Sequence, residues 1–111
     1  MAKNLSAGVL LDFYGELLTE KQQKALELYY NEDLSLAEIA DDMQVSRQGV
    51  RAFIKNGEEH LQKFEEKLGM FGRFSDISRL TEDMKSAVTE LPEGKIKEKL
   101  TEKIAEIKER L

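Results

Sequence analysis

The stretch SLAEIADDMQVSRQGVRAFIK, residues 35–55, predicts two short helices joined by a tight turn. Ser35 followed three positions later by Glu38 is a capping box, which satisfies amide groups that a helix start leaves unpaired. Ser46 is expected to cap the second helix in the same way. Apolar residues recur at helical spacing in both segments: Leu36, Ile39, Ala40 and Met43, then Val50, Phe53 and Ile54. The pattern is that of a helix-turn-helix, with the second helix in the position of a recognition helix.

The predicted recognition helix carries a cationic stripe on the side opposite its apolar residues. Arg47, Arg51 and Lys55 are spaced four apart, and no acidic residue occurs between residues 46 and 56. The positive end of the helix dipole, at the helix N-terminus, attracts phosphate. Side chains in the first turn of a helix held against the backbone in this way can reach base edges. The candidate nucleic-acid-binding residues are Ser46, Arg47, Gln48, Arg51 and Lys55. The alternative is a solvated helix face without a ligand.

The remaining segments predict further helices and no strands. Residues 6–18 form a first helix capped by Ser6, with an inward face of Val9, Leu10, Phe13, Leu17 and Leu18. A second helix follows the capping box formed by Thr19 and Gln22. Gly49 is expected to let the preceding helix approach closely. The prediction is an all-α protein whose domains comprise a four-helix bundle over residues 1–68, with the recognition helix at 46–67, and a two-helix extension over 69–111 that begins with a turn at 69–72.

Composition excludes several classes of function. The chain has 111 residues, no cysteine and one histidine, so it lacks the means for a disulfide framework or a histidine-based metal site. No glycine-rich phosphate loop or nucleophile elbow is present. Adjacent acids such as Asp41 and Asp42 point to different sides of a helix. We therefore expect no enzymatic activity and no cofactor. No apolar run reaches the length of a membrane span, so a cytoplasmic protein without membrane insertion is expected.

Charge is distributed unevenly along the chain. Residues 1–70 hold 8 Lys and Arg against 13 Asp and Glu, whereas residues 71–111 hold 9 of each. The acidic part includes the helix-turn-helix, so long-range attraction to a polyanion is weak. Phosphate binding would have to come from the local cationic stripe.

The last 41 residues carry more apolar surface than a small core needs. Seven residues are predicted to mediate self-association into a homo-oligomer, with a dimer favoured: Phe71, Phe74, Ile96, Leu100, Ile104, Ile107 and Leu111. The alternative is packing within the chain, against the end of the recognition helix.

Several motifs resemble known bacterial proteins. Leu18-Thr19, Tyr29-Tyr30, and the segments at 35–40 and 45–48 resemble the C-terminal, promoter-reading region of sigma factors. The segment FYGELLT at 13–19, with the QQK and LYY that follow it, is more similar to the small bacterial YlxM family, over essentially the full length. This resemblance implies an accessory or regulatory protein of the signal recognition particle pathway. The partners it implies are components of the particle, its receptor, or nucleic acid, either DNA or RNA.

Two other functions remain compatible with these motifs. The part of the recognition helix without acidic residues, 46–56, is equally suited to a DNA-binding transcriptional regulator. A protein-binding module could reuse the same fold, because a fold does not define a function.

Overall fold

A computed structural model describes residues 2–111 of the chain. It is all-helical across this range, as predicted. The helices are α1 (Leu5–Tyr14), η1 (Gly15–Leu17, a 3₁₀ turn), α2 (Glu20–Tyr30), α3 (Leu36–Met43), α4 (Arg47–Leu68), α5 (Met70–Val88) and α6 (Lys95–Glu109). The described residues form two compact units, which divide between Gly69 and Met70.

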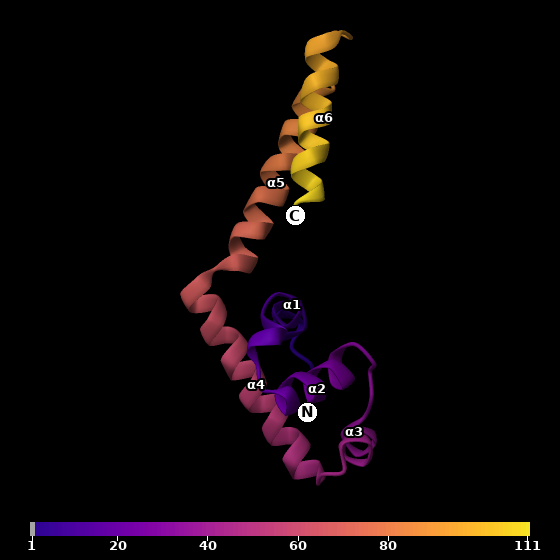
Figure 1. Cartoon of the computed structure of the whole chain (residues 1–111), viewed down its shortest axis with the longest axis vertical. Helices are drawn as coiled ribbons and strands as arrows, with labels where there is room; N and C mark the ends of the chain where they lie inside the picture. Colours follow the sequence, from indigo (N-terminus) through magenta and orange to yellow (C-terminus); the bar gives the residue numbers. More distant parts are fainter. Residues whose placement is uncertain (1) are drawn as a thin grey trace. The chain divides into compact units, whose positions relative to one another are not determined.

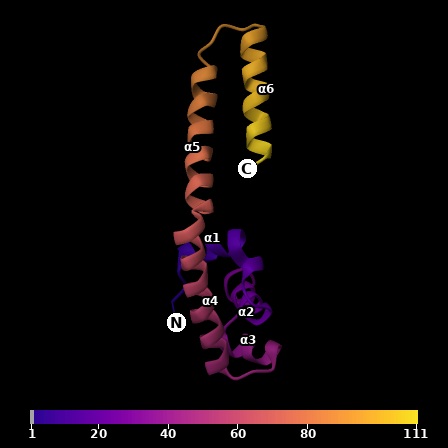
Figure 2. The same cartoon turned by 60° about the vertical axis from the view of Figure 1, so that its left-hand side comes forward.

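Helix α4 is the spine of the first unit, and α1, α2 and α3 all pack against it (Figures 1 and 2). The recognition helix predicted over 46–67 spans Arg47–Leu68, with Ser46 as its N-cap. Its inward residues Val50, Ile54 and Leu61 are fully buried, together with Leu26 of α2 and Ile39 of α3. This core fixes the orientation of α4 within the unit.

At Gly57, side chains of α2 lie close against the backbone of α4. A Cβ atom at this position would lie 2.7 Å from Leu26 Cδ1 and 3.5 Å from Gln22 Cβ. Gly57 lies on the same helical stripe as Val50, Ile54 and Leu61, where a side chain would hold the two helices apart. Close approach was predicted for Gly49 instead. At Gly49 the nearest atoms belong to Ser46 and Val45, so this glycine accommodates the turn and not the body of α3.

The first helix differs from its prediction in both cap and register. Asn4, not Ser6, caps α1, because its side chain accepts a hydrogen bond from the Ser6 amide at 3.0 Å. The buried residues of this helix are Ala7, Leu10, Leu11 and Tyr14. Val9 and Leu17, both predicted to face inward, are 38% and 57% exposed. Leu17 turns outward because the α-helix ends at Tyr14 and a tighter 3₁₀ turn changes the periodicity.

Two tyrosines hold the second half of α4. The Tyr14 hydroxyl donates a hydrogen bond to Glu65 Oε1 at 2.5 Å, and the Tyr30 hydroxyl donates one to Glu58 Oε1 at 2.6 Å. Tyr30 also accepts a hydrogen bond from the Asn4 amide at 3.0 Å. The N-terminus of α1, the end of α2 and the middle of α4 are thereby joined through one phenol.

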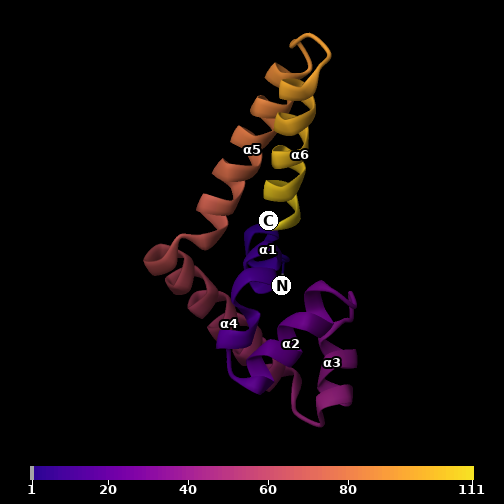
Figure 3. The same ribbon diagram turned by 45° about the horizontal axis from the view of Figure 1, so that its top comes forward.

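The second unit is a hairpin in which α5 and α6 run antiparallel and side by side (Figures 2 and 3). A turn was predicted at 69–72, but only Gly69 leaves the helical conformation, with φ of 60°, and α5 begins directly at Met70. The helices are joined by residues 89–94, which contain the chain's one proline. Within residues 2–111, no helix is long and apolar enough to cross a membrane.

Candidate nucleic-acid interface

The turn between α3 and α4 is held by hydrogen bonds on both sides. Gln44 adopts the left-handed conformation with φ of 57°, and the Val45 amide donates to Ala40 O at 3.0 Å. Gln44 also closes the end of α3 with its side chain, whose Nε2 donates to Asp41 O at 2.7 Å. These are the contacts of a helix C-terminus that reverses direction sharply, and they aim α4 away from α3.

Both helices of the motif start at the serines that the sequence predicted. Ser35 and Glu38 form the reciprocal capping box, with each side chain 3.1 Å from the other residue's backbone nitrogen. The hydrogen bond that the Ser35 amide donates to the Glu38 carboxylate is the main cause that lowers the pKa of Glu38, and the Ser35 side chain adds to the same effect. At the second helix, Ser46 Oγ accepts a hydrogen bond from the Gly49 amide at 3.0 Å. Ser46 thus has a structural role in starting α4.

The other four candidate residues lie on the solvent side of α4. Arg47, Gln48, Arg51 and Lys55 are all exposed, whereas Val50 and Ile54 on the opposite side are fully buried. In the part of the chain that the structure describes, Arg47, Arg51 and Lys55 form no ion pair. Their charges are therefore available to a phosphate without breaking an internal contact.

Acidic side chains limit the cationic surface at both ends. Asp41 lies with Arg47 in an open groove of about 510 Å³ beside the turn, lined also by Ala37, Ala40, Gln44, Val45 and Ser46. Asp42 binds Lys24 of α2 through an ion pair of 3.4 Å. At the other end, Glu58 and Glu59 follow Lys55 within one turn of helix. The cationic surface from Arg47 to Lys55 is roughly 12 Å long at 1.5 Å per residue, which is about the width of a major groove.

Sequence reasoning missed two features that shape this surface. The first is Gly57, whose lack of a side chain lets α2 pack closely against the buried side of α4, while Lys55 is exposed. The sequence signal for this contact was the position of Gly57 on the same stripe as Val50, Ile54 and Leu61. The second is the pair of tyrosines bound to Glu58 and Glu65. No local pattern in the sequence predicts these contacts, because the partners are 28 and 51 residues apart.

The capped helix pair, the tight turn and the exposed cationic side of α4 define a helix-turn-helix protein, here followed by a helical hairpin. Residues 1–108 match a family model described as "Putative helix-turn-helix protein, YlxM / p13 like". The chain belongs to this family, UPF0122, as the resemblance predicted.

Relatives in the same family come from several bacteria. A UPF0122 protein of Acetivibrio thermocellus is 41% identical over 116 residues, which cover 98% of this chain and 99% of the relative. One of Halalkalibacterium halodurans is 46% identical over 86 residues, covering 78% and 79% respectively. A third, of Desulforamulus reducens, is 52% identical over 71 residues, covering 64% and 61%. The sequence similarity to the Acetivibrio protein therefore extends over both helical units of this chain.

Proposed function

We propose that this protein binds RNA through the first half of α4, as an accessory or regulatory component of the signal recognition particle pathway. The single observation that carries RNA binding is the surface of Arg47, Gln48, Arg51 and Lys55, which is exposed at the start of α4 on a stretch of helix, residues 46–56, that contains no acidic residue. The pathway is supported by the family resemblance.

The charge of the first unit shapes how such binding works. The net negative charge of the first unit repels a polyanion. The cationic surface therefore attracts RNA only within about 8–10 Å, the screening length at physiological salt. Three cations give a modest gain from counterion release. The isolated protein is thus expected to bind RNA weakly. Its binding should be stronger when another component of the particle holds the RNA nearby.

The test is a titration of the particle's purified RNA with the protein at several salt concentrations. Arg51→Ala should weaken binding and lower the slope of log affinity against log salt by about 0.7–0.9. Lys67→Ala is the matched control, since it removes one exposed cation from the end of the same helix, outside the surface. Equal loss in the two variants, or no binding at micromolar protein, would show that the surface of Arg47, Gln48, Arg51 and Lys55 is not the binding site for this RNA.

The pathway is tested separately from RNA binding. The protein should be retained by reconstituted particle or by its receptor, and should change their GTP turnover. If it binds RNA in general yet neither is retained nor alters turnover, the assignment to this pathway is wrong while the α4 interface stands.

A DNA-binding regulator is the second candidate, favoured by one observation. Arg47 and Gln48 occupy the first turn of α4, where a recognition helix presents its side chains to base edges in the major groove. Arg47→Ala should then relax sequence preference, whereas Lys55→Ala should weaken binding to all sequences alike. Selection from random duplexes decides: without an enriched sequence, this candidate fails.

A further inference from the structure

The hairpin of α5 and α6 has almost no core of its own. Across residues 70–111, only Thr81 and Ile104 are buried, and the Thr81 hydroxyl donates its hydrogen bond back to Ile77 O. Many large apolar side chains are exposed instead. They are Met70, Ile77, Leu80, Met84, Leu91, Ile96, Leu100, Ile107 and Leu111, with exposed fractions from 38% to 74%. The hairpin is therefore incomplete as a folded unit.

Units of this size need an additional source of stability. Around 40 residues, disulfides, a metal or oligomerisation usually supplies it. The chain contains no cysteine, and residues 2–111 hold no group of three His, Asp or Glu side chains that could bind a metal. Of these three sources, oligomerisation is the one that this sequence allows.

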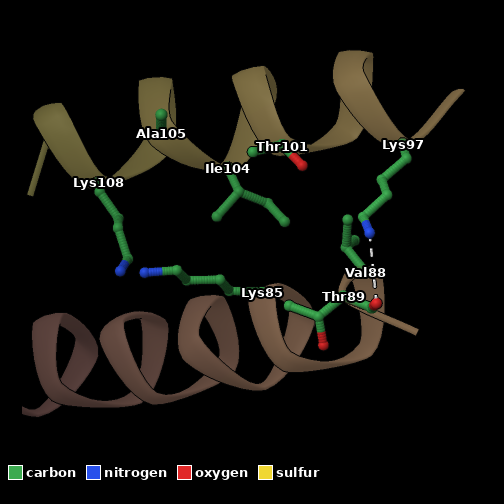
Figure 4. Close-up of a pocket in the computed structure, with 8 residues that line it drawn as sticks. All are labelled: Lys85, Val88, Thr89, Lys97, Thr101, Ile104, Ala105 and Lys108. Atoms are coloured by element: carbon green, nitrogen blue, oxygen red, sulfur yellow. Dashed lines mark hydrogen bonds between the residues drawn. The ribbon is translucent and has the colours of Figure 1, made fainter. Parts of the chain in front are cut away.

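The two sides of the hairpin differ in chemistry. One side holds a pocket of about 320 Å³ whose rim carries Lys85, Lys97 and Lys108 (Figure 4). Lys97 binds Glu93 at 2.6 Å, and Lys108 forms an ion pair with Glu82. Burying this side against another copy would bring six lysines together, at a high desolvation cost.

The other side is apolar. Its groove of about 580 Å³ is lined by Ile77, Leu80, Met84 and Ala87 of α5 and Ile107 of α6, together with Thr81 and Asp83. Leu100 lies one heptad before Ile107, so both share one face of α6. Ile104, predicted to mediate self-association, lies in the hairpin interior, and Phe71 and Phe74 are half-buried. We define the apolar side by Ile77, Leu80, Met84, Leu100 and Ile107.

We propose that a second copy of this chain docks on the apolar side, so that two hairpins form a four-helix bundle. The apolar stripes of the two helices have equal lengths, about 11 Å from Ile77 to Met84 and about 11 Å from Leu100 to Ile107 at 1.5 Å per residue. A face built from two equal antiparallel stripes is complementary to itself under a twofold rotation.

Charge also favours a second copy as the occupant. Residues 70–111 hold 9 Lys and Arg and 9 Asp and Glu, so two hairpins meet without net repulsion. The side chains of the apolar side then fill the centre of the bundle, while the lysine rim stays in water.

Sedimentation equilibrium of the full chain at micromolar concentration tests the proposal. The wild type, with a chain mass of 12.7 kDa, should sediment as twice that mass. Leu80→Glu should weaken dimerisation by roughly 100-fold or more, because each copy would bury a carboxylate without a partner. Ala105→Glu is the matched control: it adds the same group to an exposed helical position beside the lysine rim, and should leave the mass unchanged.

Leu80→Ala separates dissociation from unfolding, since it removes apolar area but retains helix propensity. It should weaken the dimer less than Leu80→Glu while circular dichroism shows the same helix content. A monomeric wild type overturns the proposal, and so does a Leu80→Glu dimer as tight as the Ala105→Glu dimer.

Discussion

Gly57→Ala tests whether α2 and α4 are in contact through backbone and side chain, as the structure shows. In an open helix this change would stabilise the protein by about 1 kcal/mol, from helix propensity alone. Here the new methyl group would lie 2.7 Å from Leu26 Cδ1, and Leu26 is fully buried, so it has no space into which to turn. Overpacking of this kind costs about 1–3 kcal/mol. A net destabilisation of up to about 2 kcal/mol is expected.

Urea denaturation measures the change, and Leu26→Ala completes a double-mutant cycle. Leu26→Ala alone should cost about 2–5 kcal/mol through its cavity. In the double variant the alanine methyl at position 57 enters that cavity, so the combined loss should be smaller than the sum. Gly49→Ala is the control glycine in the same helix, where the nearest atom would lie at 3.3 Å. If Gly57→Ala is as stabilising as an open-helix substitution, or if the cycle is additive, the close contact is refuted.

Three further predictions concern caps, register and ionisation. Ser35→Ala should lower the free energy of unfolding by about 1 kcal/mol, measured by urea denaturation. Leu10→Ala should cost about 2–5 kcal/mol because Leu10 is buried, whereas the exposed Leu17 should tolerate alanine nearly unchanged. Burial, and the hydrogen bond donated to Glu58, raise the pKa of Tyr30 to about 12 from 10.0. The stability this neutral phenol provides is complete below pH 10 and lost as pH rises towards 12. Tyr30→Phe should lack that step in the pH dependence of unfolding.

Local chemistry made the helix starts predictable. Thr19 with Gln22, and Ser35 with Glu38, form the capping boxes that their spacing indicated, and Ser46 begins α4. Such contacts involve residues three apart, so the sequence contains the whole interaction. The amphipathic character of α4 was also predictable, because the spacing of its apolar residues is a local property of the sequence. The amphipathic helix, its caps and the turn were enough to indicate the helix-turn-helix class.

Errors arose at the ends of helices, where the apolar spacing does not determine how the backbone leaves the α-helix. The register of α1 depends on where its α-helical hydrogen bonding ends, and the change to a 3₁₀ turn at Gly15 rotates Leu17 outward. The break after α4 needed one residue, Gly69 at φ of 60°, although four residues of turn character suggested a longer loop. Neither the sequence nor the structure identifies the ligand, because exposed cations are compatible with DNA, RNA or an acidic protein surface.

The positions of the tyrosines in the chain have a spectroscopic consequence. The chain has no tryptophan and three tyrosines, and all three, Tyr14, Tyr29 and Tyr30, belong to the first unit. Absorbance and fluorescence excited near 280 nm therefore report on the helix-turn-helix unit alone, without any label, while far-ultraviolet circular dichroism sums over both units. Melting curves from the two signals will coincide if the protein unfolds as one cooperative body and separate if the hairpin melts on its own.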